Sequence, residues 1–80
     1  MTIKPAIVKR ILEICKERNI KPNELAVISG VTPSTVYSMI NPSRKDLSVT
    51  TLKKLCDGLE IDMIEFFNTD LFRNLEQEIK

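Results

Sequence analysis

Hydrophobic residues recur every three or four positions along most of this chain, the spacing that gathers them on one side of an α-helix. In the first such stretch, Ile7, Ile11 and Ile14 follow these steps, and the charged residues Lys9, Arg10, Glu13 and Lys16 lie on the other side. Pro5 suits a first helical turn, and Asn19 breaks the pattern with a residue that tolerates a left-handed cap. We therefore predict a helix over about residues 5–18.

The next two stretches predict a pair of short helices joined by a tight turn at Gly30, over residues 22–29 and 33–40. Pro22 and Pro33 each stand where a first helical turn accepts proline. Thr32 precedes Pro33 as an N-cap, and Pro42 disfavours helical geometry at the residue before it. The hydrophobic positions expected to face the core here are Leu25, Ala26, Val31, Val36, Met39 and Ile40.

The second half of the chain predicts further helices and no strand, because no segment alternates apolar and polar residues for long. Ser48 is the expected N-cap of a helix ending at Asp57, with Gly58 as its stop and Val49, Leu52, Leu55 and Cys56 on its apolar face. Asp62 is the expected cap of a helix carrying Ile64, Phe66 and Phe67. A last helix is expected from Leu71 to about Ile79, capped by Asp70, with Phe72 and Leu75 on the same stripe.

Composition limits the chemistry open to this chain. Eighty residues make one small domain, and they contain no histidine, no glycine-rich loop and two cysteines without CxxC spacing. We expect Cys15 and Cys56 to be buried apolar residues rather than a disulfide or metal site. We therefore expect no enzyme activity, no cofactor and no metal ion. No apolar run approaches the about 20 residues of a membrane helix, and no secretory signal is evident, so we expect a cytoplasmic protein.

The net charge of +1 conceals an asymmetry between the two ends of the chain. Residues 1–21 carry six basic and two acidic residues, a net +4, and residues 62–80 carry two basic and five acidic residues, a net −3. A polyanion would be attracted to the first end and repelled by the second, although both could be ordinary solvated helix faces.

Residues 21–41 thus have the pattern of a helix-turn-helix, which presents its second helix to the major groove of DNA. Small polar side chains on the outer face of that helix could bond to base edges, and backbone N–H groups at the start of the first helix could bind a phosphate. Pro33 offers only apolar contact, for example with a thymine methyl group. Arg44 and Lys45 follow the second helix and could neutralise phosphates, although Asp46 weakens this patch.

The segments LAVISGVTPSTVYSMIN and LSVTTLKKLCDGLEIDMIEFF resemble the Cro and phage-repressor-type (XRE-like) helix-turn-helix regulators over about residues 7–67. The resemblance implies an all-α, compact, five-helix, lambda-repressor-like domain over residues 1–67 that is often dimeric and binds operator DNA. Residues 68–80 would be a short C-terminal helical extension. The DNA-contacting residues it implies, together with those proposed from chemistry, are Asn23, Thr32, Pro33, Ser34, Thr35, Tyr37, Ser38, Asn41, Arg44 and Lys45.

Two functions compete on this fold. The first is sequence-specific binding of double-stranded DNA by a small regulator, most simply a repressor. The second is an antitoxin-like or partner-binding module with weak or no DNA binding, a reading favoured by the modest charge and by Pro33, where many relatives have a base-reading Gln or Arg. The C-terminal stripe could join a homodimer, pack on its own core, or dock a protein partner.

Overall fold

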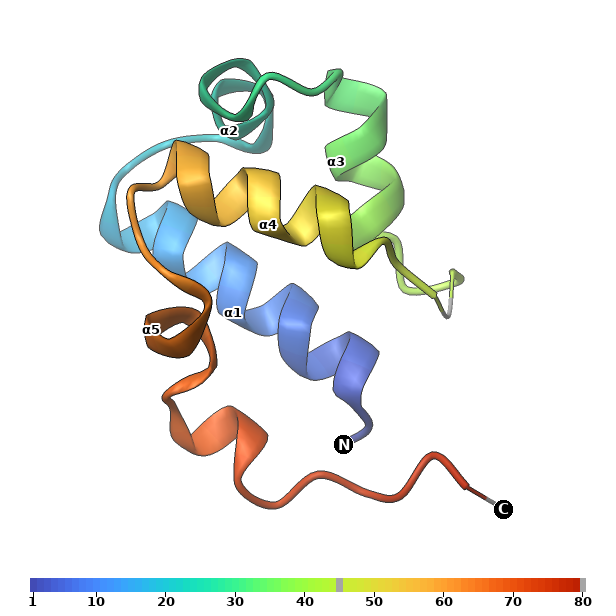
Figure 1. The fold of residues 1–80 in the computed structure, drawn as a ribbon. Coiled ribbons are helices and arrows are strands. Elements are labelled where there is room, and N and C mark those ends of the chain that lie inside the picture. The colour runs from blue at the N-terminus through green and yellow to red at the C-terminus, as the bar shows by residue number, and fades with distance from the viewer. Residues whose placement is uncertain (45, 80) are drawn as a thin grey trace.

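The computed structural model describes residues 1–44 and 46–79, and within these residues the chain is all helical. Five α-helices follow one another and end in a single 3-10 turn, and none of those described is long and apolar enough to cross a membrane. Figure 1 shows α1 and α4 running in similar directions through the body of the domain, with α2 and α3 at one end and α5 at the other. The elements are α1 (Ile3–Glu17), α2 (Pro22–Ser29), α3 (Pro33–Ile40), α4 (Val49–Gly58), α5 (Met63–Phe67) and η1 (Asp70–Phe72).

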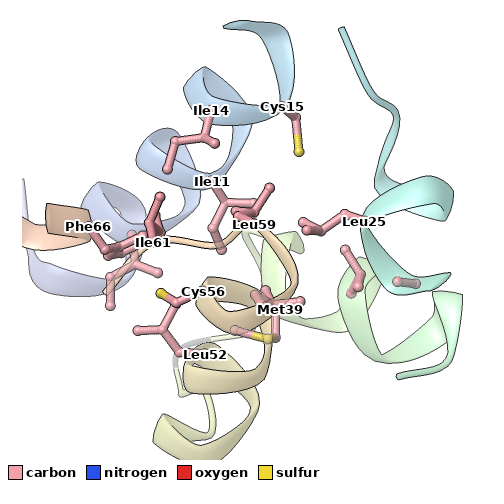
Figure 2. Packing of buried hydrophobic residues seen from close by; sticks show 14 residues of the cluster. Ile11, Ile14, Cys15, Leu25, Met39, Leu52, Cys56, Leu59, Ile61 and Phe66 are labelled. Atoms are coloured by element: carbon pink, nitrogen blue, oxygen red, sulfur yellow. The ribbon is translucent and has the colours of Figure 1, made fainter. Parts of the chain in front are cut away.

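The hydrophobic core draws on all five α-helices. Figure 2 shows side chains from α1, α2, α3, α4 and α5 converging on one centre, with Leu59 and Ile61 from the α4–α5 connection. Phe66, Ile11 and Leu25 are among the largest fully buried side chains. The residues of this cluster are Ile7, Ile11, Ile14, Cys15, Leu25, Ala26, Val36, Met39, Leu52, Leu55, Cys56, Leu59, Ile61 and Phe66.

Three of the helix ends reverse direction through a residue in the left-handed region, and each uses the paired hydrogen bonds of a Schellman motif. Asn19 (φ 55°) follows α1, as predicted, and Gly30 (φ 69°) follows α2. The third is Glu60 (φ 59°), whose N–H bonds to the Asp57 carbonyl while the next N–H bonds to that of Cys56.

The prediction that this helix ends near Gly58 is confirmed, since Gly58 is the last residue of α4, but the left-handed residue that follows the helix is Glu60 rather than this glycine. Gly58 has a different role. A Cβ atom added there would clash with the Ser29 Oγ and would lie 2.9 Å from the Ile28 carbonyl oxygen. Glycine thus lets α4 approach the end of α2, against which it packs.

The prediction of a helix from Leu71 to Ile79 is wrong. Only Asp70–Phe72 forms a 3-10 turn, which follows Thr69 rather than a capping Asp70. A helix of this length is marginal without tertiary packing, and here the backbone beyond the turn instead bonds to the start of the chain. The Glu76 N–H donates to the Met1 carbonyl, and the Ile3 N–H donates to the Glu78 carboxylate.

Phe72 joins this C-terminal segment to the core by packing against Phe66 and Phe67, at ring-centroid distances of 6.1 and 4.8 Å. Two other residues that were expected in the core lie outside it. Val49 and Ile64 are 70% and 80% exposed, and each lies in the first turn of its helix.

Candidate nucleic-acid interface

The second helix of the helix-turn-helix, α3, is fixed from its inner side. Val36 and Met39 are buried in the core, and Val31 and Ile40 pack against it while partly buried. The helix begins at Thr32, whose side-chain oxygen accepts a hydrogen bond from the Thr35 N–H at 3.3 Å. This cap and the packing of α3 against α2 set which side of α3 is presented outward.

The outer side of α3 carries the residues that the sequence placed there. Pro33, Ser34 and Tyr37 are exposed, and Thr35 and Ser38 are half-buried at the edge of the same face. The Tyr37 side chain is 49% exposed, so its ring rests partly on the protein while part of it faces solvent. None of these five residues belongs to the hydrophobic core.

Three hydroxyl groups meet at the start of α3. The Thr32 Oγ1 lies 3.1 Å from the Ser34 Oγ and 2.9 Å from the Thr35 Oγ1, and in both pairs either oxygen can be the donor. Because a hydroxyl is both donor and acceptor, this cluster can offer either function outward.

A shallow hollow of about 290 Å³ lies beside α3 and joins it to the loop that follows. Thr35, Ser38 and Arg44 line it, so the structure brings this arginine to the edge of the outer face. Asp46 lines the hollow too and places a negative charge among these polar groups. Ser48 and Thr51 line the same hollow and were not among the predicted site residues. Their signal was the hydroxyl-rich run directly after the basic loop.

The loop after α3 is held by its own side chains and by α1. The Asn41 Oδ1 accepts hydrogen bonds from the Ser43 N–H at 2.9 Å and the Ser43 hydroxyl at 2.8 Å. The ammonium group of Lys4 donates to the carbonyl oxygens of Arg44 at 2.9 Å and Asp46 at 3.2 Å. Lys4 is only 7% exposed, so the hydrogen bonds of its ammonium group are made within the protein. Lys45, the other basic residue proposed here, lies outside the described residues.

The start of α2 is the predicted phosphate-binding end, but the structure places a carboxylate there. Asn23 is exposed in the first turn, and Pro22 has no N–H to offer. The carboxylate of Glu24 accepts the Lys21 N–H at 3.2 Å and caps this end of the helix. A negative charge therefore stands where a phosphate would have to approach, close to the favourable partial charge of the helix.

The two cysteines, Cys15 and Cys56, are buried and are not joined in a disulfide. Burial raises the pKa of the Cys15 thiol and is the main cause that raises the pKa of the Cys56 thiol, so both stay protonated and poorly nucleophilic. Within residues 1–44 and 46–79, no group of three or more cysteine and carboxylate side chains is placed so that it could hold a metal ion. The polar groups on the outer face of α3 are suited to hydrogen bonding rather than to group transfer.

Comparison with known proteins agrees with this geometry. The sequence pattern of the Cro/C1-type HTH DNA-binding domain matches residues 10–70. A solved structure titled "Crystal structure of the prophage Lp1 protein 11" superposes with a TM-score of 0.78 at 26% sequence identity. That superposition covers 94% of this chain and 100% of the other. A search of curated proteins gives no match.

Proposed function

Because this chain belongs to the Cro/C1-type helix-turn-helix DNA-binding family, we propose that it is a small transcriptional regulator, acting as a repressor, that binds double-stranded DNA at specific sequences. The observation that carries the proposal is the two-sided character of α3. Val36 and Met39 anchor its inner side, while Ser34 and Tyr37 stand exposed on the outer side. A helix held in this way fits the major groove, where hydroxyl groups can bond to base edges.

The contacts divide into those that read bases and those that position the protein. Thr32, Pro33, Ser34 and Ser38 form the base-reading set, with Tyr37 able to reach a base edge or a phosphate. Asn41 and Arg44, at the end of α3, would contact the DNA backbone together with Lys45 and the backbone N–H groups of Asn23 and Glu24. Because serine hydroxyls accept many partners, we expect a tolerant sequence preference.

We further propose that the protein binds DNA as a two-fold dimer in the cytoplasm. Ile64 is 80% exposed and lines a shallow apolar hollow with Met63 and Phe67 on the outer side of α5. Burying this surface against a second copy would compensate for the small core of an 80-residue chain. Two recognition helices in such a dimer would lie about 34 Å apart and match a palindromic site.

Selection of bound sequences from a random DNA pool tests the binding, the half-site spacing and the symmetry together. The Ser34→Ala, Ser38→Ala double variant should then bind the selected site less tightly, by about tenfold if two base contacts are lost. Asn74→Ala, an exposed change on the C-terminal segment, is the matched control and should bind as the parent does.

Two results would count against the proposal. One is absence of binding at low salt, where the electrostatic contribution is largest. The other is an affinity for selected DNA that does not respond to the double serine variant. Either result would favour the alternative, a partner-binding module. The carboxylates of Glu24 and Asp46 beside the interface support this alternative.

A further inference from the structure

A second surface lies away from the outer face of α3, on the exposed side of α1. It is an open groove of about 570 Å³ between α1, the loop after α3 and the C-terminal segment. Figure 1 shows the C-terminal segment passing below the start of α1, and two residues of this segment, Gln77 and Glu78, line the groove.

The floor of the groove is mostly apolar and is only partly shielded from water. Pro5, Val8 and Leu12 follow one another along α1, and Met1 and Pro42 also line the groove. The side chain of Leu12 is 45% exposed and that of Met1 48%. An apolar floor with a polar rim is the anatomy of a protein interface, and an open groove of this kind would enclose a small molecule poorly.

The charges around this floor are mainly positive. Lys4, Lys9 and Arg44 line the groove, and Glu78 is the acidic residue among its lining side chains. Lys9 and Arg44 are exposed and can meet a partner, whereas the Lys4 ammonium is already bonded to the loop. The rim therefore complements a segment that is acidic as well as apolar.

The chain's own C-terminal segment supports this choice of partner. It is acidic, it runs without helix beside the start of α1, and the Glu78 carboxylate accepts the Ile3 N–H at 3.2 Å. An acidic segment without helix therefore already lies beside the start of α1, and the groove next to it is open. We propose that this groove binds an acidic, leucine-rich segment of another protein.

Occupation of the groove would reach the DNA-binding face through two residues. Arg44 lines both the groove and the hollow beside α3, and Lys4 lines the groove while holding the loop that carries Arg44. If one guanidinium group serves both surfaces, the acidic segment and DNA compete. This coupling rests on the proposed function, whereas binding of the segment does not.

The test uses the full chain and a fluorescent peptide in which glutamate and leucine alternate. Fluorescence anisotropy should show saturable binding, and amide chemical-shift changes should map to residues 4–12 and 42–44. A peptide alternating lysine and leucine should not bind, and one alternating glutamate and serine should bind at least about fivefold more weakly. No binding, equal binding of the lysine peptide, or shifts confined to other surfaces would overturn the proposal.

Substitutions inside and outside the groove distinguish binding at this site from nonspecific binding of the peptide. Leu12→Glu and Lys9→Glu should each weaken peptide binding by about fivefold or more, whereas Val27→Glu, which alters a 76% exposed residue on α2, should not. Thermal unfolding followed by circular dichroism verifies that all three remain folded. A response to Val27→Glu equal to that of Leu12→Glu would overturn the proposal.

The coupling has its own readout. Saturating selected DNA should weaken peptide binding several-fold, and the peptide should weaken DNA binding by the same factor. Independent binding of the two ligands would refute the coupling. Failure to bind any DNA would refute the proposed function, while peptide binding mapped to the groove would still stand.

Discussion

The Nζ atom of Lys4 lies 2.9 Å from the backbone carbonyl oxygen of Arg44, a residue 40 positions later in the chain. The same ammonium group reaches the Asp46 carbonyl at 3.2 Å. A buried cation in the first turn of α1 thereby determines where the basic loop after α3 sits. The loop is positioned by a residue that would contact no DNA itself.

Replacing Lys4 by methionine should therefore weaken DNA binding more than the loss of one distant charge would. Two hydrogen bonds from a charged donor are removed, and we expect about 3 kcal/mol of lost stability and about tenfold weaker binding of the selected site. Urea unfolding and fluorescence anisotropy measure the two effects. Lys4→Arg should restore part of the affinity, since a guanidinium group can donate to the same carbonyls.

The control for this experiment is Lys9→Met, which removes an exposed charge from the same helix. Equal losses of affinity in the Lys4→Met and Lys9→Met proteins would mean that charge alone matters, and that the loop contact does not.

Glu24→Gln should strengthen DNA binding. Glutamine can keep the hydrogen bond to the Lys21 N–H and removes the negative charge from the end of α2, where the helix dipole favours an approaching phosphate. We expect about threefold tighter binding at low salt, with the gain shrinking as salt is added. Glu13→Gln changes the net charge equally from an exposed position on α1, and it should give a smaller gain. Equal gains would remove the special role of α2.

Gly58→Ala should destabilise the fold by about 1–3 kcal/mol because its Cβ would meet the Ser29 Oγ and the Ile28 carbonyl. Gly30→Ala is an instructive comparison, since nothing lies within 4 Å of a Cβ there but φ is +69°. Backbone strain alone should then cost about 1 kcal/mol. Urea unfolding measures both, and a harmless Gly58→Ala change would contradict the close packing of α2 and α4.

The two thiols should make stability fall at alkaline pH. Burial raises their pKa in the folded state, so the folded protein holds protons that the unfolded chain releases. Their contribution is fully present below the thiol pKa of the unfolded chain and is lost as pH rises through the higher folded value. Urea midpoints measured from neutral pH upward should decline, and the Cys15→Ala, Cys56→Ala double variant should decline less. Identical pH profiles would show that the thiols contribute nothing.

Most of the helical framework could be predicted from the sequence because local signals agreed with tertiary packing. Pro22, Thr32 and Pro33 mark the starts of α2 and α3, and the structure has both helices at the expected bounds. The outer and inner sides of α3 followed from the spacing of Val36 and Met39 alone.

What failed depended on contacts between distant segments. The stripe through Leu71, Leu75 and Ile79 has helical spacing, yet backbone bonds to the start of α1 compete with it, and Ile79 remains 87% exposed. Gly58 was predicted only as the stop of its helix, because no neighbouring residue in the sequence indicates that α4 packs closely against Ser29. Lys4 was counted only among the basic residues near the start of the chain, since its carbonyl partners lie on another part of the chain.

The hydroxyl trio of Thr32, Ser34 and Thr35 has a consequence for how such a regulator could diversify. Each proton in the trio can rotate, so the same backbone can present a donor at one target and an acceptor at another. If α3 reads DNA as proposed, an operator could change by one base, and the protein could still bind it without any substitution. Tight discrimination would have to be acquired separately, through a longer side chain in place of one of these small ones.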